Sequence, residues 1–562
     1  MRRPVSRVLL PVGLAAALVL AACTDPAEQS AVDEPEQVQP TRESGASRGV
    51  DATAAPVQYA DAEPVVATTT VWSDGEEVDL AVSVGPVMRE EDLAVLPLSF
   101  EVIGDRGEVN LMSSALRSPG LSNSPTQVRL VDTERMIVSQ PAMQIREDTG
   151  DRAMVAWTDE YMPDHGRFRA AAGEDPVTWA GAFGAPRGQH TAVLLQHFGL
   201  IPQVPVVDEP VRDVPTVSDL LDGGARADVT PRVFPIESYR EHIDTPVGTR
   251  TESDRTTVTI ATDVLFDVDS AELSDDADTA LQAAAAELAD VDGGDLAIVG
   301  HTDDVLDEAH NQALSEARAE AVHERLQELA DLSVFDDVQT EGRAFHEPVV
   351  PNDSDANRAL NRRVDLHFTP PEDPQSPRDG ADVELPETEG PVGTADEGVE
   401  VTRNIEDEAR VHVSVESIER VDHVLVGQIR VEQIQGPGPD GSGQIAWPLT
   451  GGVSGPRGTG LRPWEHSTTD TVTLLAGGQR LFPLDYFVPD LDDEDAEPTL
   501  YPLTDRHFAG DYAPGESRVA TVLWPALAVD SVAVDVPAET DNAGMWHSLG
   551  VDPWRITDVP VE

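Results

Sequence analysis

The pattern of apolar and polar positions divides this chain into two β-rich stretches with a stretch of mixed character between them. From residue 72 to 207, runs such as "VDLAVSVGPV" and "LAVLPLSFEVI" alternate apolar with polar residues and are separated by turn-forming clusters. Such alternation is typical of strands that bury one face. Residues 397–537 show the same pattern, so the sequence predicts a β-rich domain in each range.

The two β-rich regions also resemble each other in sequence. "APRGQHTAVLLQHFGLIPQVPV" from Ala185 and "APGESRVATVLWPALAVDSVAV" from Ala513 align without gaps, which places Leu195 on Leu523. A duplication explains this match, and both regions are then expected to be immunoglobulin-like sandwiches. A chance likeness between valine-rich strands is the alternative.

Residues 256–369 alternate between strand and helix patterns. "TTVTIATDVLFDVDS" predicts a strand, and Ser274 followed by acids is a natural start for a helix with Leu281 and Leu288 on its apolar face. "DLAIVGHTD" predicts a buried strand, and a second helix pattern begins at Asn311. "VQTEGRA" and "NRRVDLHF" predict two more strands. The expected fold is therefore multidomain, with an α+β sandwich of order β-α-β-α-β-β between two β-rich domains.

The N-terminal stretch is typical of a secretion signal followed by a lipid attachment site. Arg2, Arg3 and Arg7 precede a mostly apolar run that is short for a membrane span. The small residues that end residues 1–22, followed by Cys23, resemble a bacterial lipobox, in which the cysteine is acylated. An ordinary signal peptide with a chance cysteine is the alternative. Because the chain has 1 cysteine, no intrachain disulfide is possible.

Four further ranges are expected to connect or extend these domains. Residues 23–71 are rich in Ala, Pro and acids and are predicted to be a disordered tether. Residues 208–255 contain several prolines and are predicted to be a connector. Residues 370–396 form a second acidic, proline-rich linker, and residues 538–562 are assigned as a C-terminal tail.

The charge of the chain excludes one class of partner. The formal net charge is -66, and all 38 basic residues are arginines. Nucleic-acid phosphates would be repelled, so no nucleic-acid partner is expected. The sequence contains no H-E-x-x-H or P-loop motif, and we expect no enzyme activity, cofactor or metal.

The stretch "GHTDDVLDEAHNQALSEARAEAV", residues 300–322, carries the candidate chemistry. Asp303 follows a predicted buried strand. Asn311, Leu314 and Arg318 recur at helical spacing and share one stripe near the start of the second helix. If the intervening loop returns the helix start to the strand end, Asp303 and Arg318 face one cleft.

Other polar residues are expected near this cleft. Arg362 and Arg363 begin the last predicted strand, and Asp267 lies at the end of the first. A carboxylate opposite a guanidinium suits a zwitterion, because the acid pairs with an ammonium group while the arginine binds a carboxylate through two hydrogen bonds. The head group of an amino acid is such a ligand.

Four motifs in order carry a family resemblance. They are "VLFDVDSAEL" (264–273), "GHTD" (300–303), "NQALSEARAEAV" (311–322) and "NRRVDLHF" (361–368). Together they resemble the OmpA-like peptidoglycan-binding domain over about 115 residues. The resemblance implies a domain without catalytic activity that binds the diaminopimelate part of a peptidoglycan stem peptide.

The resemblance also assigns roles to residues. It implies that Asp303 is the key acid and Arg318 the key arginine, with further ligand contacts from Asn311, Leu314, Asp267, Arg362 and Arg363. One position departs from the family, because Leu306 stands where a glycine is usual. If the backbone there needs a positive φ, the leucine is strained.

Several alternatives remain at this stage. In the first alternative, Asp303 and Arg318 form an ion pair with a purely structural role. His301 is expected to be a structural residue, and the less favoured alternative is a metal ligand or general base. Asp267 and Asp269 resemble a carboxylate pair for glycoside hydrolysis. "DLDDEDAEP", residues 490–498, suggests calcium but lacks the EF-hand spacing. The C-terminal tryptophans serve core packing or, alternatively, form a contact patch for a sugar or a protein.

The expected protein is a lipid-anchored, extracytoplasmic component of a bacterial envelope. Its lipid is expected to insert into the outer leaflet of the cell membrane, or into the outer membrane in an organism with two membranes. Residues 256–369 are expected to bind peptidoglycan. Two attachments joined by a tether gain from their effective concentration. The alternatives are a sensor or assembly scaffold whose β domains bind a protein partner, and a wall-remodelling enzyme that the domain targets to peptidoglycan.

Overall fold

The computed structural model describes most of the chain beyond residue 58. The described ranges are 59–73, 75–111, 127–145, 152–158, 168–221, 225–289, 291–370, 384–403, 409–436, 449, 469, 471–489, 498–505, 513–538 and 552–562. The predicted signal sequence, Cys23 and residues 490–497 lie outside them. No helix of the described ranges combines the length and the apolarity that crossing a membrane requires.

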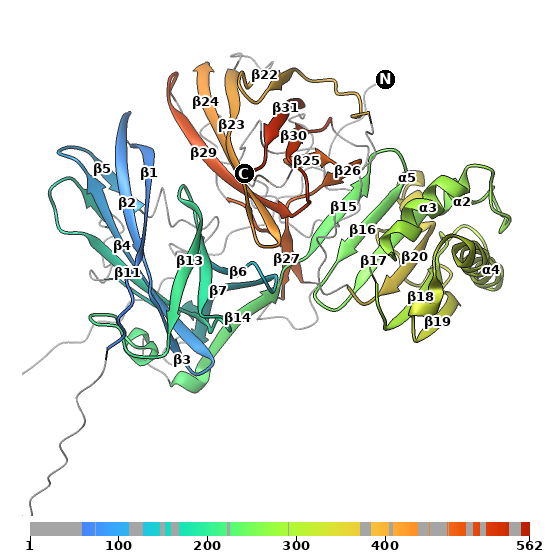
Figure 1. The fold of residues 1–562 in the computed structure, drawn as a ribbon, viewed down its shortest axis with the longest axis horizontal. Coiled ribbons are helices and arrows are strands. Elements are labelled where there is room, and N and C mark those ends of the chain that lie inside the picture. The colour runs from blue at the N-terminus through green and yellow to red at the C-terminus, as the bar shows by residue number, and fades with distance from the viewer. Residues whose placement is uncertain are drawn as a thin grey trace, which may run out of the picture. The chain divides into compact units, whose positions relative to one another are not determined.

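The first β-rich region is built from mainly antiparallel strands (Figure 1), and its largest buried apolar cluster includes Leu80, Leu96 and Phe100. Its strands are β1 (Val65–Ser73), β2 (Glu76–Val84), β3 (Val87–Glu90), β4 (Leu93–Ile103), β5 (Glu108–Asn110), β6 (Arg129–Asp132), β7 (Ile137–Ile145), β8 (Arg152–Met154), β9 (Ala156–Thr158), β10 (Arg169–Ala171), β11 (Val177–Gly184), β12 (His190–Leu195), β13 (Gly199–Val207) and β14 (Val229–Pro235). The alternation predicted for this region is visible in β2, where Val78, Leu80, Val82 and Val84 are buried.

The second β-rich region has its own core, to which the buried Trp524 and Trp554 belong. The packing role predicted for the tryptophans therefore holds for these two. The strands are β21 (Val392–Thr394), β22 (Val399–Arg403), β23 (Ala409–Val421), β24 (Val424–Gln435), β25 (Thr473–Ala476), β26 (Gln479–Leu481), β27 (Asp485–Val488), β28 (Thr499–Pro502), β29 (Ser517–Pro525), β30 (Ser531–Val536) and β31 (Trp554–Pro560).

The two β-rich regions share a pattern of antiparallel strand pairing. The neighbours β1-β2-β4-β11 in the first region correspond to β22-β23-β24-β29 in the second. The neighbours β7-β6-β12-β13 correspond likewise to β26-β25-β30-β31. This correspondence favours the duplication. It matches β29 with β11, however, whereas the ungapped sequence alignment matches β29 with β12.

The strand order differs from the immunoglobulin order that we predicted. In each region the second strand of the repeat lies between the first and the third, as in β22-β23-β24. In an immunoglobulin domain the third strand belongs to the opposite sheet. Valine-rich alternation is common to all β-sandwiches, so it identifies buried strands without identifying their neighbours.

Several predicted boundaries differ from the observed elements. The strand β1 begins at Val65, within the predicted tether, and β31 lies within the predicted C-terminal tail. The predicted connector, residues 208–255, contains β14 together with β15 (Ser238–His242) and β16 (Val247–Thr251), and short 3-10 helices at Val217–Leu220 and Arg226–Asp228. Prolines in these ranges interrupt the alternation, but they are tolerated at strand ends and edges.

The segment between the two β-rich regions alternates strands and helices in the predicted order. It contains β17 (Thr256–Ala261), α2 (Thr262–Leu265), α3 (Ala277–Glu287), β18 (Asp295–Gly300), α4 (Glu308–Leu329), a 3-10 helix (Leu332–Val334), β19 (Asp337–Gly342), α5 (Asp355–Asn361) and β20 (Arg363–Phe368). Neighbouring strands follow the order β19-β18-β20-β17-β16-β15, and β15 also pairs with β26 of the second β-rich region.

Local details of this segment depart from the sequence prediction. The first predicted strand ends at Ala261, where the chain turns into the short helix α2. Ser274 does not cap α3. Instead its hydroxyl donates a hydrogen bond to the carbonyl oxygen of Val264 at 2.8 Å, which ties the start of this helical region to α2. The long helix α4 begins at Glu308, with Asp307 as its N-cap.

Both long helices pack on one face of the sheet. Alternate residues of β20, namely Val364, Leu366 and Phe368, join the core beneath α3 and α4. Gly300 and Gly342 allow α4 to lie very close to β18 and β19, because a Cβ atom at Gly300 would stand 2.2 Å from the carbonyl oxygen of Ser315, and one at Gly342 2.4 Å from the backbone nitrogen of Glu316. This close approach holds the first turns of α4 beside the end of β18.

Candidate functional site

Asp303 lies in the loop after β18, and its carboxylate is mostly buried, with 14% of the side chain exposed. One carboxylate oxygen accepts a hydrogen bond from the backbone nitrogen of Val305 at 3.2 Å. The other is 2.9 Å from Nη1 of Arg362. Its ion-pair partner is therefore Arg362, not Arg318, so the purely structural Asp303–Arg318 pair considered from the sequence is not present.

Arg318 projects from α4 and is buried, although its guanidinium carries a full charge. Its Nε atom donates a hydrogen bond to the carbonyl oxygen of Ser270 at 2.9 Å, and the group lies 5.3 Å from the ring centre of Phe266. Burial lowers the pKa of Arg318, while Asp263, Asp269 and Asp303 act in the opposite direction. Within the described residues neither Nη atom donates a hydrogen bond, and neither is fully enclosed.

Arg362 links two acids at the end of the sheet. Its Nε and Nη2 atoms contact the carboxylate of Asp263 at 2.8 and 2.5 Å, and Nη1 contacts Asp303. Hydrogen bonding to Asp263 is the main reason why the pKa of Arg362 is raised. The arginine is therefore a fixed positive charge beside Asp303.

Asn311 fixes the loop that carries Asp303. The side chain is buried, and its Nδ2 atom donates to the carbonyl oxygens of Asp303 at 3.2 Å and Leu306 at 3.0 Å. Leu306, which replaces the expected glycine, is not among the residues with a positive φ. The strain considered for this leucine is therefore absent, because the loop has a conformation that any residue adopts.

Arg363 is directed away from Asp303. It precedes Val364, which faces the helices, and neighbouring residues of a strand point to opposite faces of the sheet. Its Nε atom contacts the buried carboxylate of Asp365 at 2.9 Å. His301 lies 3.4 Å from the same carboxylate and is itself buried. Burial would raise the pKa of Asp365, but His301, Arg363 and Thr259 outweigh it and hold the pKa at about 2. These residues form a buried polar group behind the sheet, where the sequence had grouped Arg363 with Arg362.

The remaining predicted residues lie around the site without direct contacts to Asp303. Asp267 is exposed on the loop after α2, and Leu314 is half-buried on α4. In the same loop Asp269 has a φ of 58°, and its carboxylate contacts Nε2 of His310 at 2.6 Å. This contact joins the loop to the first turn of α4.

Sequence reasoning missed Asp263 and His310. Asp263 was assigned to a continuous strand, and the break after Ala261 leaves no trace in the apolar pattern. His310 directly precedes Asn311 and so lies off the stripe of Asn311, Leu314 and Arg318, and its partner Asp269 is 41 residues away. A spacing rule within one element does not find such a pair.

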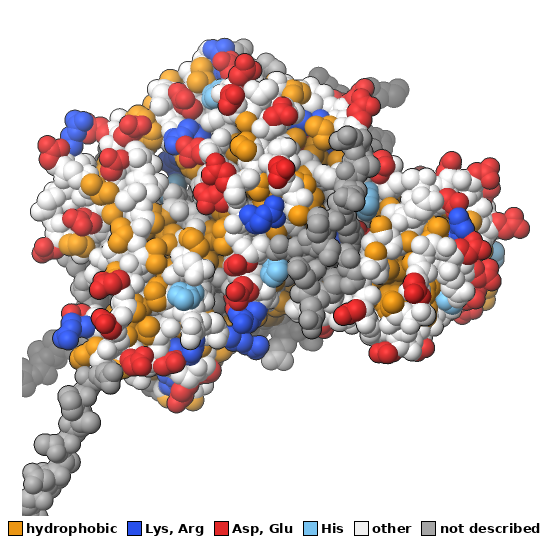
Figure 2. All heavy atoms as spheres, viewed as in Figure 1, with side chains coloured by type: hydrophobic (Ala, Val, Ile, Leu, Met, Phe, Trp, Pro, Cys, Tyr) orange, Lys and Arg blue, Asp and Glu red, His pale blue; other side chains and the backbone are white. Residues whose placement is uncertain are grey.

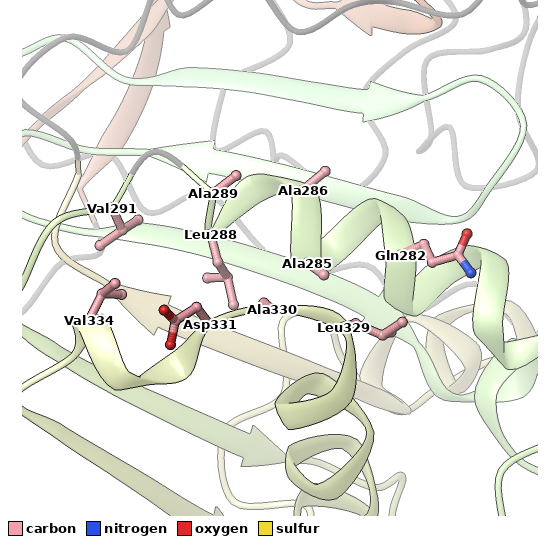
Figure 3. A pocket seen from close by; sticks show the side chains of 10 residues that line it. All are labelled: Gln282, Ala285, Ala286, Leu288, Ala289, Val291, Leu329, Ala330, Asp331 and Val334. Carbon is pink, nitrogen blue, oxygen red and sulfur yellow. The ribbon is translucent and has the colours of Figure 1, made fainter.

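A cavity of about 440 Å³ lies elsewhere in this segment, between the C-terminal ends of α3 and α4. Figure 3 shows mostly apolar side chains around it, among them Leu288, Leu329 and Val334. Along α4, Leu329 is about 27 Å from Asn311 at the helical rise of about 1.5 Å per residue. The cavity is therefore separate from the site of Asp303 and Arg318.

The comparisons with known proteins concern this same segment. The model of the OmpA family matches residues 265–362. The outer-membrane lipoprotein YfiB of Pseudomonas aeruginosa is 36% identical over 101 residues, which are 18% of this chain and 59% of that protein. This chain therefore matches less than two thirds of the length of that relative.

Two solved structures are similar over the same part. The cell wall anchor of the T6SS from Pseudomonas aeruginosa is 34% identical and covers 22% of this chain and 87% of its own, with a TM-score of 0.20. A putative MotB-like protein from Desulfovibrio vulgaris is 26% identical and covers 22% and 77%, with a TM-score of 0.19. At these TM-scores the structural likeness adds nothing to the sequence match. The family match and the sequence likeness to the lipoprotein together identify residues 265–362 as a domain of the OmpA family.

Proposed function

We propose that the OmpA-family domain binds peptidoglycan through the diaminopimelate residue of the stem peptide and that the chain thereby ties a membrane to the cell wall. The observation that carries this proposal is the state of Arg318. A buried guanidinium needs hydrogen-bond acceptors, and its two Nη atoms find none within the described residues. A ligand carboxylate supplies both acceptors in the two-pronged geometry that arginine favours.

Asp303 supplies the negative charge that a zwitterionic ligand needs in addition to Arg318. One carboxylate oxygen of Asp303 contacts Arg362, and the other is held by a backbone amide in a loop that Asn311 fixes. An ammonium group of the ligand adds a third partner to this carboxylate. In this proposal Asp303 and Arg318 bind the two charged groups of diaminopimelate, with Asn311 and Arg362 as positioning residues and Asp267 and Leu314 at the periphery.

The rest of the chain attaches and spaces this domain. In our proposal Cys23 carries the acyl chains outside the cytoplasm, and the two β-rich regions act as spacers or bind a protein partner. The relative YfiB is by name an outer-membrane lipoprotein, which supports a lipid-anchored position in the envelope.

Co-sedimentation of the purified chain with peptidoglycan tests the proposal. Asp303→Asn and Arg318→Gln should each reduce the affinity about ten-fold or more, because a hydrogen bond to a charged group contributes about 1.5–3 kcal/mol. Asp304→Asn, at an exposed position, and Arg325→Gln, at a half-buried position of α4 that pairs with Asp278, are controls with the same charge changes, and they should bind within about two-fold of the unchanged chain.

The outcome separates binding from non-specific adhesion. If the unchanged chain stays in the supernatant, the proposal is wrong. If the control variants lose as much affinity as Asp303→Asn and Arg318→Gln, the contact is a general charge effect and the site is not the one described. Thermal unfolding of each variant establishes that the loss does not come from unfolding.

A further inference from the structure

Three large apolar side chains are exposed on the two loops that border the site. Val268 is 98% exposed on the loop after α2, and Val305 and Leu306 are 67% and 44% exposed on the loop after β18. Single exposed apolar residues are common on proteins. Three such residues lie beside one charged site, in a segment that carries many acids on its visible surface (Figure 2), and this grouping calls for an explanation.

Hydrogen bonds hold both loops next to the charged residues. Asp269, the neighbour of Val268, contacts His310 on α4 at 2.6 Å, and Ser270 accepts the hydrogen bond of Arg318 at 2.9 Å. The carbonyl oxygen of Leu306 accepts from Asn311 at 3.0 Å. The apolar side chains are therefore attached to the same fixed framework as Asp303 and Arg318.

The charges around these side chains limit what they can contact. Asp267, Asp269, Asp304 and Asp307 are exposed on the same two loops. A carboxylate of a ligand is repelled there, while an uncharged apolar group removes valine and leucine surface from water without a charge penalty. The surface thus favours a small, neutral, apolar group beside the zwitterion.

We propose that Val268, Val305 and Leu306 form a subsite for the alanine that follows diaminopimelate in the stem peptide. The inference rests on the proposed function, because it places the ligand by its charged groups at Asp303 and Arg318. The neighbour on the other side of diaminopimelate is a glutamate with a free carboxylate, which the acids of these loops disfavour. The alanine methyl is the neighbouring group that fits.

Two peptides that differ by one alanine test the subsite. The first is the stem tripeptide ending in diaminopimelate, and the second is the tetrapeptide with the additional alanine, both amidated at that end so that their charges are equal. Isothermal titration of the purified chain should show the tetrapeptide binding about four-fold more tightly, because burying one methyl group is worth about 0.8 kcal/mol.

The double variant Val268→Ser with Leu306→Ser should bind both peptides with the affinity that the unchanged chain has for the tripeptide. Val334→Ser is the matched control, because Val334 is an exposed valine of the same domain beside the separate cavity at the far end of α4. It should keep the four-fold preference.

Each other outcome has a distinct meaning. If the unchanged chain binds both peptides equally, the subsite is wrong while the proposed function stands. If it binds neither peptide, the proposed function fails, and the subsite with it. If Val334→Ser also loses the preference, the effect is not local to the two loops and the subsite is wrong.

Discussion

Individual residues in this domain carry charge inside the fold, and Asp365 shows the consequence for stability. Its carboxylate is buried on the side of the sheet opposite the helices, where His301, Arg363 and Thr259 surround it. These partners hold its pKa at about 2 although burial alone would raise it. The folded state therefore binds the proton of this group less readily than the unfolded state does.

Asp365→Asn should lower the free energy of unfolding by about 2 kcal/mol or more at pH 7, because one pKa unit corresponds to about 1.36 kcal/mol. A depressed pKa contributes stability above the ordinary value near 4, and this contribution disappears as the pH falls through about 2. Denaturant unfolding of both forms should show the difference shrinking to about half by pH 3. A difference that is constant between pH 7 and pH 3 would show that the charge of Asp365 is not its cause.

At the scale of elements, the position of α4 decides whether the site exists. Arg318 belongs to the helix and Asp303 to the loop after β18, so their relation depends on how closely the helix lies on the strand. Gly300 permits this closeness, since a Cβ atom there would meet the backbone of Ser315 at 2.2 Å. The backbone of Ser315 cannot move aside to make room for this atom, as the far end of a flexible side chain could.

Gly300→Ala should push α4 away from β18, destabilise the domain by about 1–3 kcal/mol as overpacked cores do, and weaken peptidoglycan binding in addition. Ala297→Gly on the same strand is a useful comparison, because it changes one methyl group without bringing a side chain against the helix. Unfolding and co-sedimentation would be measured on both. Unchanged binding by a folded Gly300→Ala chain would mean that the site does not depend on this contact.

Across the whole molecule, the negative charge acts against the proposed partner. The chain has a net charge of -66, and stem peptides carry carboxylates of their own. On the face shown in Figure 2, acidic side chains outnumber basic ones. Long-range repulsion between the protein and the wall is therefore expected, while attraction is confined to the short-range contacts of the site.

Binding to peptidoglycan should accordingly become tighter as sodium chloride rises from about 0.01 M to about 0.15 M, since the Debye length falls from about 30 Å to about 8 Å. The affinity of Arg318→Gln should remain low at both concentrations. Co-sedimentation across a salt series measures this. A steady loss of binding with added salt would indicate a contact dominated by unscreened attraction and would contradict the expectation.

The sequence prediction succeeded where a signal lies within one element or one motif. The order of strands and helices from Thr256 to Phe368 follows from apolar periodicity, and four short motifs identify the family that the match to residues 265–362 supports. The ranges of the tether, the connector and the tail were less accurate. Prolines stand near strands β1, β15, β16 and β31 and interrupt the pattern. In addition, β15 and β31 pair with strands far along the chain, β26 and β21, whereas β1 pairs with the adjacent β2.

The chain by itself determined which residue types are available to the site and in which order they occur. Only the tertiary structure decided which of them meet. It joins Arg362 to Asp303 and Asp263, and it directs Arg363 to Asp365 on the opposite side of the sheet. Among the described residues it leaves the Nη atoms of Arg318 without an acceptor. The physical reason is that periodicity reports which face of its own element a residue occupies, whereas pairing between charges depends on how separate elements pack.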